Sequence, residues 1–352
     1  MNNDWKNYLL QNGAEQSQDG LFIFDSTFSD AGLAEGSDII CDLSHFSTVV
    51  VAGGDATDVI QGQFTNDVNK VDEEHSQISA FCNNKGRMLA NFRLFQSQQN
   101  YFLSIRNDLV DGSIEHLQKY VLRAQVAIQD VSEQLIHIGI SGNNAEKLLS
   151  QSIDKLNTTV DSVSQNDDYI AIRVADKIPR YEIFCSLQHA KALWESLSEK
   201  TSVTSSTYWD YLNIMNGLPF IDSNTREEFV PQMANMELIN GVSFEKGCYT
   251  GQEIVARTHY LGKQKRRTYR IKIISDTPPK AGDQLATGTS TENQYTGTLI
   301  TVYQTAANEY EALAVIQIKS AESETLKLKD ADADADAEIT LLELPYPLEE
   351  QE

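Results

Sequence analysis

One cysteine has sequence neighbours that favour an activated thiol. Cys248 lies in the segment KGCYTGQEIVAR, residues 246–257, after Lys246 and just before Thr250, where a helix is predicted to begin. A nearby ammonium group and the positive end of a helix dipole both favour the thiolate over the thiol. The pattern predicts a thiol that reacts or binds a metal, and the alternative is a small cysteine packed beneath the loop.

The residues that follow the cysteine predict how it is positioned. Thr250 and Glu253 have the spacing of a capping box, so a helix is predicted from Thr250 to about Gly262. Glycines beside the cysteine would permit close approach of the backbone to another group. The motif residues expected to shape this loop and helix are Gly247, Tyr249, Gly251, Gln252 and Glu253.

Nearby cations, rather than a neighbouring general base, are predicted to favour the thiolate form of Cys248. Lys246 and Arg257 are the cations expected to act on Cys248. At ~1.5 Å rise per residue, His259 lies about 13 Å along the helix axis from the cap, which is too far to serve as the base. A single exposed cysteine also supplies too few ligands for a stable iron–sulfur cluster, so no metal site is predicted beyond a transient cluster contact at Cys248.

A run of basic residues follows the motif in a chain that is otherwise acidic. No acidic residue occurs from Ile254 to Ser275, yet the formal net charge of the chain is −23. Such a net charge opposes a broad phosphate-binding surface, so any contact with RNA must be local. A solvated face is the alternative. The basic residues are Arg257, Lys263, Lys265, Arg266, Arg267 and Arg270.

Composition indicates a globular protein with two or three domains. The chain has 352 residues, of which 41% are hydrophobic and 22% charged. It contains no run of roughly 20 apolar residues, and its N-terminus lacks the pattern of a signal peptide, so we expect a cytoplasmic protein without a membrane contact. Its 4 cysteines form no CxxC pair, which argues against a zinc ribbon or a disulfide framework.

The elements that must position the motif follow an α+β pattern. Residues 47–67 predict a strand, a turn at Gly53-Gly54 and a helix opening near Asp55. Two strand-like runs then flank a turn at 83–86, and an amphipathic helix over 113–126 precedes a strand over 134–142. This order suggests a split β-α-β layout, and a second set of strands and helices follows from 169 to 221.

Short strands after residue 265 predict a small β-barrel. The predicted domains are an N-terminal extension or edge strand over 1–37, an α+β region over 38–265 and the barrel over 266–348. An acidic low-complexity loop over 327–338 interrupts the barrel and is expected to have no packing role.

The motif and several other segments resemble the YgfZ family of folate-binding proteins linked to tRNA modification, which is related to the glycine-cleavage T-protein, an aminomethyltransferase. The likeness covers roughly residues 38 to 348. The segments that carry it are KGCYTGQEIVAR, GGDATDVIQGQFTNDV, FCNNKGRMLANFRLF, YWDYLNIMNGLPFID and LPYPLEE.

The resemblance implies two interleaved ferredoxin-like domains and a C-terminal β-barrel, arranged as a three-domain ring around tetrahydrofolate or a derivative. Two tryptophans contribute to the folate site of that family. Trp209 matches one of them, whereas Phe46 stands at the position of the other. Phenylalanine can still stack on a pterin or benzoyl ring but has no indole N–H to donate.

The chain departs from the aminomethyltransferase where that enzyme carries an acidic pair beside the folate. Ala90 and Asn91 occupy those positions, and neither can act as a carboxylate. The GYTGE segment, which supplies a pterin-binding glutamate in the T-protein, is also missing around PRYEIFC. The resemblance therefore implies that the folate cavity is kept and that aminomethyl transfer is lost.

These observations favour an auxiliary factor rather than an enzyme. The resemblance implies a folate-binding protein that supports iron–sulfur enzymes, including tRNA methylthiotransferases, and thereby tRNA thiolation, with Cys248 as the functional thiol. One alternative is a folate-dependent one-carbon transferase acting on tRNA or protein. Another is a direct tRNA-binding module, which the net charge of −23 opposes.

Overall fold

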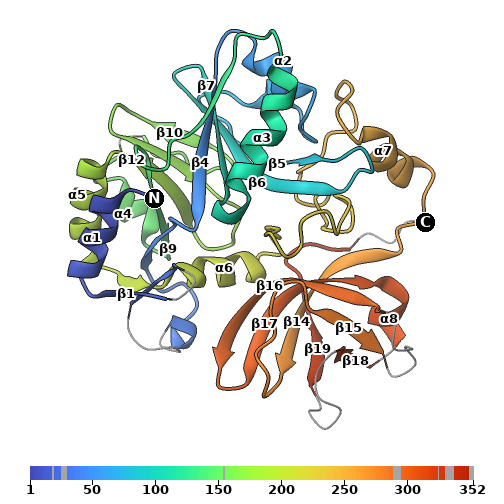
Figure 1. The fold of residues 1–352 in the computed structure, drawn as a ribbon. Coiled ribbons are helices and arrows are strands. Elements are labelled where there is room, and N and C mark those ends of the chain that lie inside the picture. Colours follow the sequence, from blue (N-terminus) through green and yellow to red (C-terminus); the bar gives the residue numbers. More distant parts are fainter. Residues whose placement is uncertain are drawn as a thin grey trace. The chain divides into compact units, whose positions relative to one another are not determined.

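The structure is a computed structural model that describes residues 1–17, 20–24, 30–153, 155–287, 295–323, 325–329 and 337–348 (Figure 1). Its residues divide into two compact units, each assembled from separate stretches of the sequence. The first unit contains Met1–Gly62, Asp67–Ile78 and Phe92–Trp209, and the second contains Gln63–Asn66, Ser79–Asn91 and Asp210–Glu352. The motif cysteine therefore belongs to the second unit, and Phe46 and Trp209 belong to the first.

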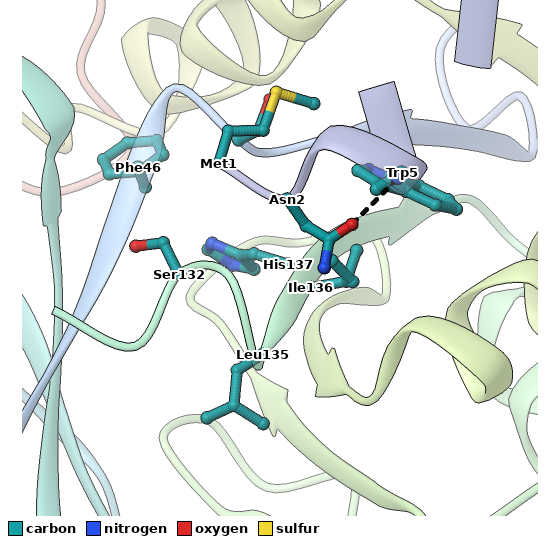
Figure 2. Close-up of a pocket in the computed structure, with 9 residues that line it drawn as sticks. Met1, Asn2, Trp5, Phe46, Ser132, Leu135, Ile136 and His137 are labelled. Carbon is teal, nitrogen blue, oxygen red and sulfur yellow. Dashed lines mark hydrogen bonds between the residues drawn. The ribbon is translucent and has the colours of Figure 1, made fainter. Parts of the chain in front are cut away.

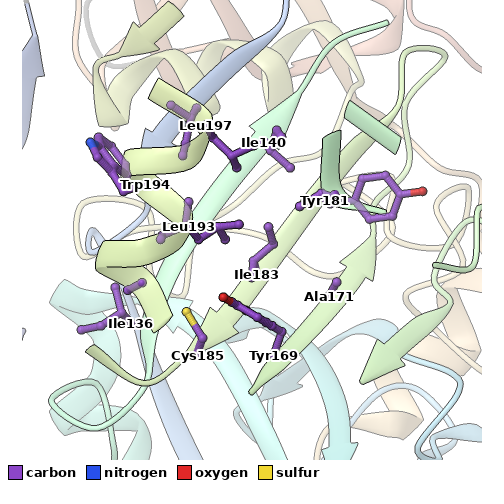
Figure 3. Close-up of a cluster of buried hydrophobic side chains, with 14 of the residues drawn as sticks. Ile136, Ile140, Tyr169, Ala171, Tyr181, Ile183, Cys185, Leu193, Trp194 and Leu197 are labelled. Carbon is purple, nitrogen blue, oxygen red and sulfur yellow. The ribbon is translucent and has the colours of Figure 1, made fainter. Parts of the chain in front are cut away.

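A six-stranded sheet in the first unit has the order β10-β11-β12-β9-β3-β13, and all neighbours are antiparallel except β13 and β3. Apolar residues of helix α5 cover one face of this sheet, with Leu193 and Trp194 packed over Ile140 and Ile183 (Figure 3). The strands are β3 (Ile39–Asp42), β9 (Ile136–Ser141), β10 (Val163–Gln165), β11 (Tyr169–Arg173), β12 (Arg180–Cys185) and β13 (Ser202–Thr204); the helices are α4 (Ala145–Leu149) and α5 (Leu187–Ser198).

The first 37 residues, predicted as an extension or edge strand, include helix α1 (Asn3–Gln11) and the short strands β1 (Ala14–Gln16) and β2 (Phe22–Phe24). Asn2 caps α1, because its side-chain oxygen accepts from the amides of Asp4 and Trp5. Trp5 packs edge to face on Trp194 of α5, with ring centroids 5.5 Å apart. Helix α1 thus contributes to the hydrophobic core of the first unit.

A five-stranded sheet has the order β5-β6-β7-β4-β8, and strands β5 and β6 each have residues in both units. The predicted strand, turn and helix are confirmed as β4 and α2, and the predicted hairpin as β5 and β6 around the turn at 83–86. The elements are β4 (Phe46–Ala52), α2 (Ala56–Gln61), η2 (Val68–Lys70), β5 (Gln77–Cys82), β6 (Met88–Ser97), β7 (Asn100–Arg106), η3 (Asn107–Leu109), α3 (Val110–Val121) and β8 (Ala127–Asp130).

The second unit ends in a six-stranded antiparallel sheet of order β18-β15-β16-β17-β14-β19. Its two edge strands, β18 and β19, contact each other, so the sheet nearly closes into the predicted barrel (Figure 1). The acidic loop falls mainly on residues 330–336, which lie outside the described residues. The elements are β14 (Arg266–Ile274), β15 (Gln284–Thr287), β16 (Gly297–Ala306), β17 (Glu309–Gln317), α8 (Ile318–Ser323), β18 (Leu326–Leu328) and β19 (Glu338–Leu342).

Residues 216–251 of the second unit contain no helix or strand and are held by turns and side-chain hydrogen bonds. Helix α6 (Ser206–Met215) precedes this stretch, and α7 (Gln252–Tyr260) follows it. The short helix η1 (Asp30–Gly32) completes the described elements. No helix in the described ranges is both long and apolar enough to cross a membrane.

Candidate functional site

The loop that carries Cys248 is fixed to a short segment far from it in sequence, residues 63–66 of the same unit. The Lys246 ammonium donates to the carbonyl oxygens of Phe64 at 2.5 Å and Asn66 at 3.0 Å. The amide of Ser243 donates to the carbonyl of Thr65 at 3.0 Å. Hydrogen bonds to a charged donor are about twice as strong as neutral ones, so these contacts fix the path of the loop.

Gly251 packs against the hairpin turn at 83–86. Its φ of +84° is in the left-handed region, and a Cβ placed on it would lie 2.5 Å from the carbonyl oxygen of Asn83 and 3.0 Å from the Cα of Gly86. Gly86 has a φ of +69°, and a Cβ placed on it would lie 2.9 Å from the Cβ of Ile254 in α7. Two glycines therefore allow the turn and the motif loop to approach at backbone distance.

Cys248 is exposed between two buried neighbours. Lys246 is 8% exposed and Tyr249 is 7% exposed, and the lysine ammonium lies 5.1 Å from the centroid of the tyrosine ring. The side chains on both sides of the cysteine thus hold the loop down while the thiol itself faces outward. The Lys246 ammonium lies among backbone carbonyls, and its action on the thiol remains a prediction.

The other three cysteines are buried, and burial suppresses their chemistry. Desolvation raises the pKa of Cys82 and of Cys185 to about 12, and it raises the pKa of Cys41 well above its usual value. These groups remain thiols at neutral pH, and a thiol is a far weaker nucleophile than a thiolate. Cys248 is the one thiol of the chain that combines exposure with the predicted motif.

The predicted capping box at the start of α7 is wrong. The helix begins at Gln252 with Gly251 as its N-cap, and no side chain caps it. Thr250 instead donates to the side-chain oxygen of Gln63 at 3.1 Å, and Glu253 is exposed. The left-handed conformation of Gly251, required by its contact with the hairpin turn, places the start of the helix two residues later than the sequence pattern predicted.

Two of the six residues of the basic run are neutralised by carboxylates. Arg267 is 3% exposed and donates to Glu237 at 2.6 Å, and Arg270 donates to Glu311 at 2.6 and 3.0 Å. Arg266 lies over Tyr295, with its guanidinium carbon 5.1 Å from the ring centroid. Within the basic run, Arg257, Lys263 and Lys265 are exposed and have no ion pair among the described residues.

His259, at the end of α7, contacts aromatic and acidic residues. Its ring stacks on Phe244 with centroids 3.7 Å apart and planes at 11°, and its Nδ1 lies 3.7 Å from the Glu237 carboxylate. Sequence reasoning missed both Phe244 and Glu237, because neither has a spacing that links it to the helix.

Phe46, the first residue of β4, lines a small pocket with Ser44, Ser132 and His137 (Figure 2). The Arg106 guanidinium carbon lies 5.3 Å from the centroid of its ring. The pocket encloses about 10 Å³, roughly the space of one water molecule. Phe46 thus presents an aromatic wall, although the pocket is too small for a pterin ring as it stands.

Trp209 of α6 is fully buried and is not among the residues that line the Phe46 pocket. Its ring packs on Gly139, where a Cβ would lie 2.7 Å from the indole, and the guanidinium carbon of Arg180 lies 4.7 Å from its centroid. The indole Nε1 is buried and has no hydrogen-bond partner among the described residues. A buried donor without a partner costs about 1–3 kcal/mol, so this atom is a place where an acceptor from a ligand would stabilise the protein.

A buried ionic cluster lies beside the Phe46 pocket. Glu182 is 3.6 Å from Nε of Arg93 and 3.7 Å from Nε2 of His137, and the His137 ring contacts Phe46 with centroids 6.2 Å apart. Burial lowers the pKa of His137, although Glu182 opposes the shift. Burial alone would raise the pKa of Glu182, but His137, Arg93 and Arg180 hold it below its usual value.

Ala90 and Asn91 are both buried within the second unit. The Asn91 amide donates to the carbonyl of Pro219 at 2.7 Å, and its oxygen accepts from the amide of Ile221 at 2.9 Å. Asn91 therefore stabilises the backbone at Pro219 and Ile221 through these two hydrogen bonds. Neither side chain supplies an acid or base.

Comparison with known proteins identifies relatives of this chain. A family model described as the GCVT N-terminal domain matches residues 30–173. The tRNA-modifying protein YgfZ of Pectobacterium carotovorum is 31% identical over 79% of this chain and 83% of its own length. That of Colwellia psychrerythraea is 32% identical over 75% of this chain and 81% of its own length.

Among solved structures, the glycine cleavage system aminomethyltransferase T from Bartonella henselae covers 97% of this chain and 96% of its own, with a TM-score of 0.77 and 15% identity. At that identity the likeness establishes a shared fold. Sequence identity over most of their length links the chain to the curated relatives, and this chain belongs to the family of the tRNA-modifying protein YgfZ.

Proposed function

We propose that this protein is a folate-binding auxiliary factor for tRNA modification and that it acts through the thiol of Cys248. The observation that carries the proposal is the presentation of Cys248: an exposed thiol on a loop held by the buried side chains of Lys246 and Tyr249. The curated relatives are named for tRNA modification. In this proposal the clients are iron–sulfur enzymes, including tRNA methylthiotransferases.

A rigidly presented single thiol suits a transient contact better than a resident cluster. Among the described residues no group of three or more His, Cys, Asp or Glu side chains is placed to hold a metal ion. Iron–sulfur clusters are usually held by four protein ligands, so Cys248 could contribute at most one of them. The proposed role is therefore thiol chemistry on, or a passing contact with, a client protein.

Tetrahydrofolate or a derivative is the proposed cofactor, and Phe46 and Trp209 are the residues proposed to bind it. The unpartnered indole N–H of Trp209 fits a site that a ligand acceptor would complete. Trp209 is fully buried, so a ligand can reach it only if its surroundings open. The arrangement of interleaved ferredoxin-like domains in a ring around this cofactor belongs to the same proposal.

A folate-dependent one-carbon transferase is the weaker candidate. Aminomethyl transfer needs a carboxylate beside the reacting nitrogens, and the side chains at the matching positions are those of Ala90 and Asn91. The hydrogen bonds of Asn91 are used up by Pro219 and Ile221. The folate in this proposal is bound by a protein that does not carry out the aminomethyltransferase reaction.

The proposed function is tested by complementation. A bacterial strain lacking its own relative is supplied with the wild-type chain, Cys248→Ala or Cys185→Ala, and methylthiolated tRNA nucleosides are quantified by mass spectrometry. We expect Cys248→Ala to fail and Cys185→Ala to restore modification, because Cys185 is a buried core residue. Normal modification with a folded Cys248→Ala protein would contradict the proposal.

A further inference from the structure

A pocket of about 420 Å³ lies in the second unit beside the C-terminal end of α7. This volume is within the range of small-ligand sites, which is roughly 300–1,000 Å³. One wall is the C-terminal segment at Tyr346, whose hydroxyl donates to the carbonyl of Gly217 at 2.7 Å. The polar and aromatic residues that line the pocket are Glu237, Asn240, Phe244, His259, Arg267 and Tyr346.

The pocket offers a stacked pair of rings, and a planar ligand would stack on the outer face of that pair. Phe244 and His259 both line it, and their rings are stacked nearly parallel at 3.7 Å. Tyr260 stands edge-on to His259, with centroids 4.8 Å apart, and is 65% exposed. An exposed tyrosine beside a stacked pair extends the aromatic surface beyond the pocket, which suits successive stacked rings.

Glu237, which lines the pocket, has one carboxylate oxygen that accepts no hydrogen bond from the described residues. Oε1 of Glu237 accepts from Arg267 at 2.6 Å, whereas Oε2 is buried and accepts no hydrogen bond in the described part of the chain. His259 Nδ1, at 3.7 Å from Oε2, is beyond hydrogen-bond distance. A ligand N–H directed at Oε2 would satisfy this carboxylate oxygen.

Positive charge lies in the chain segment between two residues that line the pocket. Lys263 and Lys265 are exposed and without an ion pair in the described ranges, and they lie in the short segment that joins His259 to Arg267, both of which line the pocket. Free cations placed beside an aromatic surface are typical of sites for single-stranded nucleic acids. The aromatic pair, the unpaired oxygen of Glu237 and the two lysines together suit a planar base that carries an N–H donor and is joined to a phosphate outside the pocket.

We propose that this pocket binds one unpaired nucleotide, with its base on the Phe244 and His259 surface and a base amino group donating to Glu237. The phosphate then lies near Lys263 and Lys265. Adenine, cytosine and guanine carry such an amino group, whereas the uracil N–H lies between two carbonyls that would repel the carboxylate. Phe46, Trp209 and Cys248 are not among the residues that line this pocket, so the inference goes beyond the proposed function.

Binding is tested with the full-length protein and fluorescein-labelled single-stranded RNA of about eight nucleotides. Fluorescence anisotropy is recorded for oligoadenylate, oligocytidylate and oligouridylate over a range of salt concentrations. The variants are His259→Ala, Glu237→Gln and Lys263→Gln/Lys265→Gln. Lys70→Gln/Lys119→Gln removes the same charge from exposed positions of the first unit and serves as the control.

We expect saturable binding of the adenine and cytosine strands, and weaker binding of oligouridylate. His259→Ala should weaken binding about 5- to 100-fold, which corresponds to the loss of one stacked base. Glu237→Gln should reduce the preference over uridine. In a plot of the logarithm of the binding constant against the logarithm of the salt concentration, the double lysine variant should have a slope smaller in magnitude than that of the wild type. The difference should be about 0.7 for each phosphate that the lysines no longer neutralise, and the control should match the wild type.

Competition identifies the source of the nucleotide. If AMP alone displaces the strand at similar concentrations, the ligand is a free nucleotide, and if only RNA does so, it is a strand; either result supports a nucleotide pocket. Absence of binding, or binding unchanged in His259→Ala and Glu237→Gln, overturns the proposal. Displacement by tetrahydrofolate but by no nucleotide also overturns it. Loss of tRNA modification in the complementation assay has no bearing on this direct measurement.

Discussion

Gly251 and Gly86 face each other at backbone distance: a Cβ on Gly251 would lie 3.0 Å from the Cα of Gly86. The contact joins the loop of Cys248 to the turn between β5 and β6 and leaves no room for a side chain. It also explains why the helix after the motif starts at Gln252 rather than at Thr250. The position of the thiol therefore depends on two residues that have no side chain.

Replacing Gly251 by alanine should destabilise the protein by about 2 kcal/mol or more, because a left-handed conformation and a close contact are both penalised. Urea unfolding measures the change. Gly247→Ala, in the same loop, is the matched control: nothing lies within 4 Å of its added Cβ, so its stability should stay within about 0.5 kcal/mol of the wild type. Equal effects at both positions would contradict the proposed packing.

Lys246→Met should cost about 2–4 kcal/mol, since it leaves the carbonyl oxygens of Phe64 and Asn66 without a charged donor. The same variant separates a structural lysine from one that tunes the thiol. The rate of Cys248 alkylation by iodoacetamide, followed against pH, reports the thiol pKa. An unchanged profile in the folded variant would remove Lys246 from the chemistry and leave Arg257 as the predicted cation.

Asn91→Asp should destabilise the second unit by about 2–4 kcal/mol. The carboxylate cannot donate to the carbonyl of Pro219, and it would be buried beside that oxygen. Asn100→Asp, at a more exposed turn, is the control. Asn91→Asp restores one carboxylate, but we expect it not to transfer a methylene group from an aminomethyl donor to tetrahydrofolate with release of ammonia.

Stability should decrease as the pH falls below about 6.5 because of His137. Burial lowers the pKa of this imidazole from 6.5, so the unfolded chain takes up a proton that the folded protein resists. His137→Phe keeps a ring against Phe184, which His137 stacks on with centroids 4.1 Å apart, and it removes the titration.

Urea midpoints at about pH 7.5 and about pH 5.5 should therefore differ less in this variant than in the wild type. Glu182 affects stability at lower pH than His137 does. Its pKa in the folded protein is below the usual 4.5, so the stabilisation by its carboxylate is lost only as the pH falls further. An equal pH response of the wild type and His137→Phe would assign the effect to other groups.

Tetrahydrofolate should quench tryptophan fluorescence saturably, and Trp209→Phe should remove the quenching. The chain has 3 tryptophans, so Trp194→Phe, in the α5 core, is the control that should keep it. Phe46→Trp should strengthen binding by restoring an indole N–H. Failure of the wild type to bind would mean that the buried Trp209 site does not open to a folate.

Local sequence patterns were sufficient to predict many of the strands and turns. The alternation of apolar residues predicted β4, the β5–β6 hairpin and the barrel strands, because these signals are contained in short stretches. The capping box failed because the fold, and not the local spacing, decides the conformation of Gly251. The hydrogen bonds from Lys246 to Phe64 and Asn66 could not be predicted for the same reason, since about 180 residues separate the partners.

The sequence proposes the residue types of the candidate site but not their surroundings. Cys248 was recognisable from its neighbours, and its exposure agrees with a functional thiol. The sequence groups Arg267 and Arg270 with the basic run, whereas in the structure Glu237 and Glu311 neutralise them. Ion pairs between residues that are 30 and 41 positions apart depend on the fold, and the basic residues of a sequence cannot by themselves reveal them.

The distribution of the cysteines has a practical consequence. Three of the thiols are buried and one is exposed, so a maleimide dye or a nitroxide should attach to the native protein at a single position without any engineered substitution. The loop that carries Cys248 is held by the buried side chains of Lys246 and Tyr249, which limits the motion of an attached probe. Distances and rotational mobility measured from Cys248 would then report on the arrival of a client protein rather than on the loop itself.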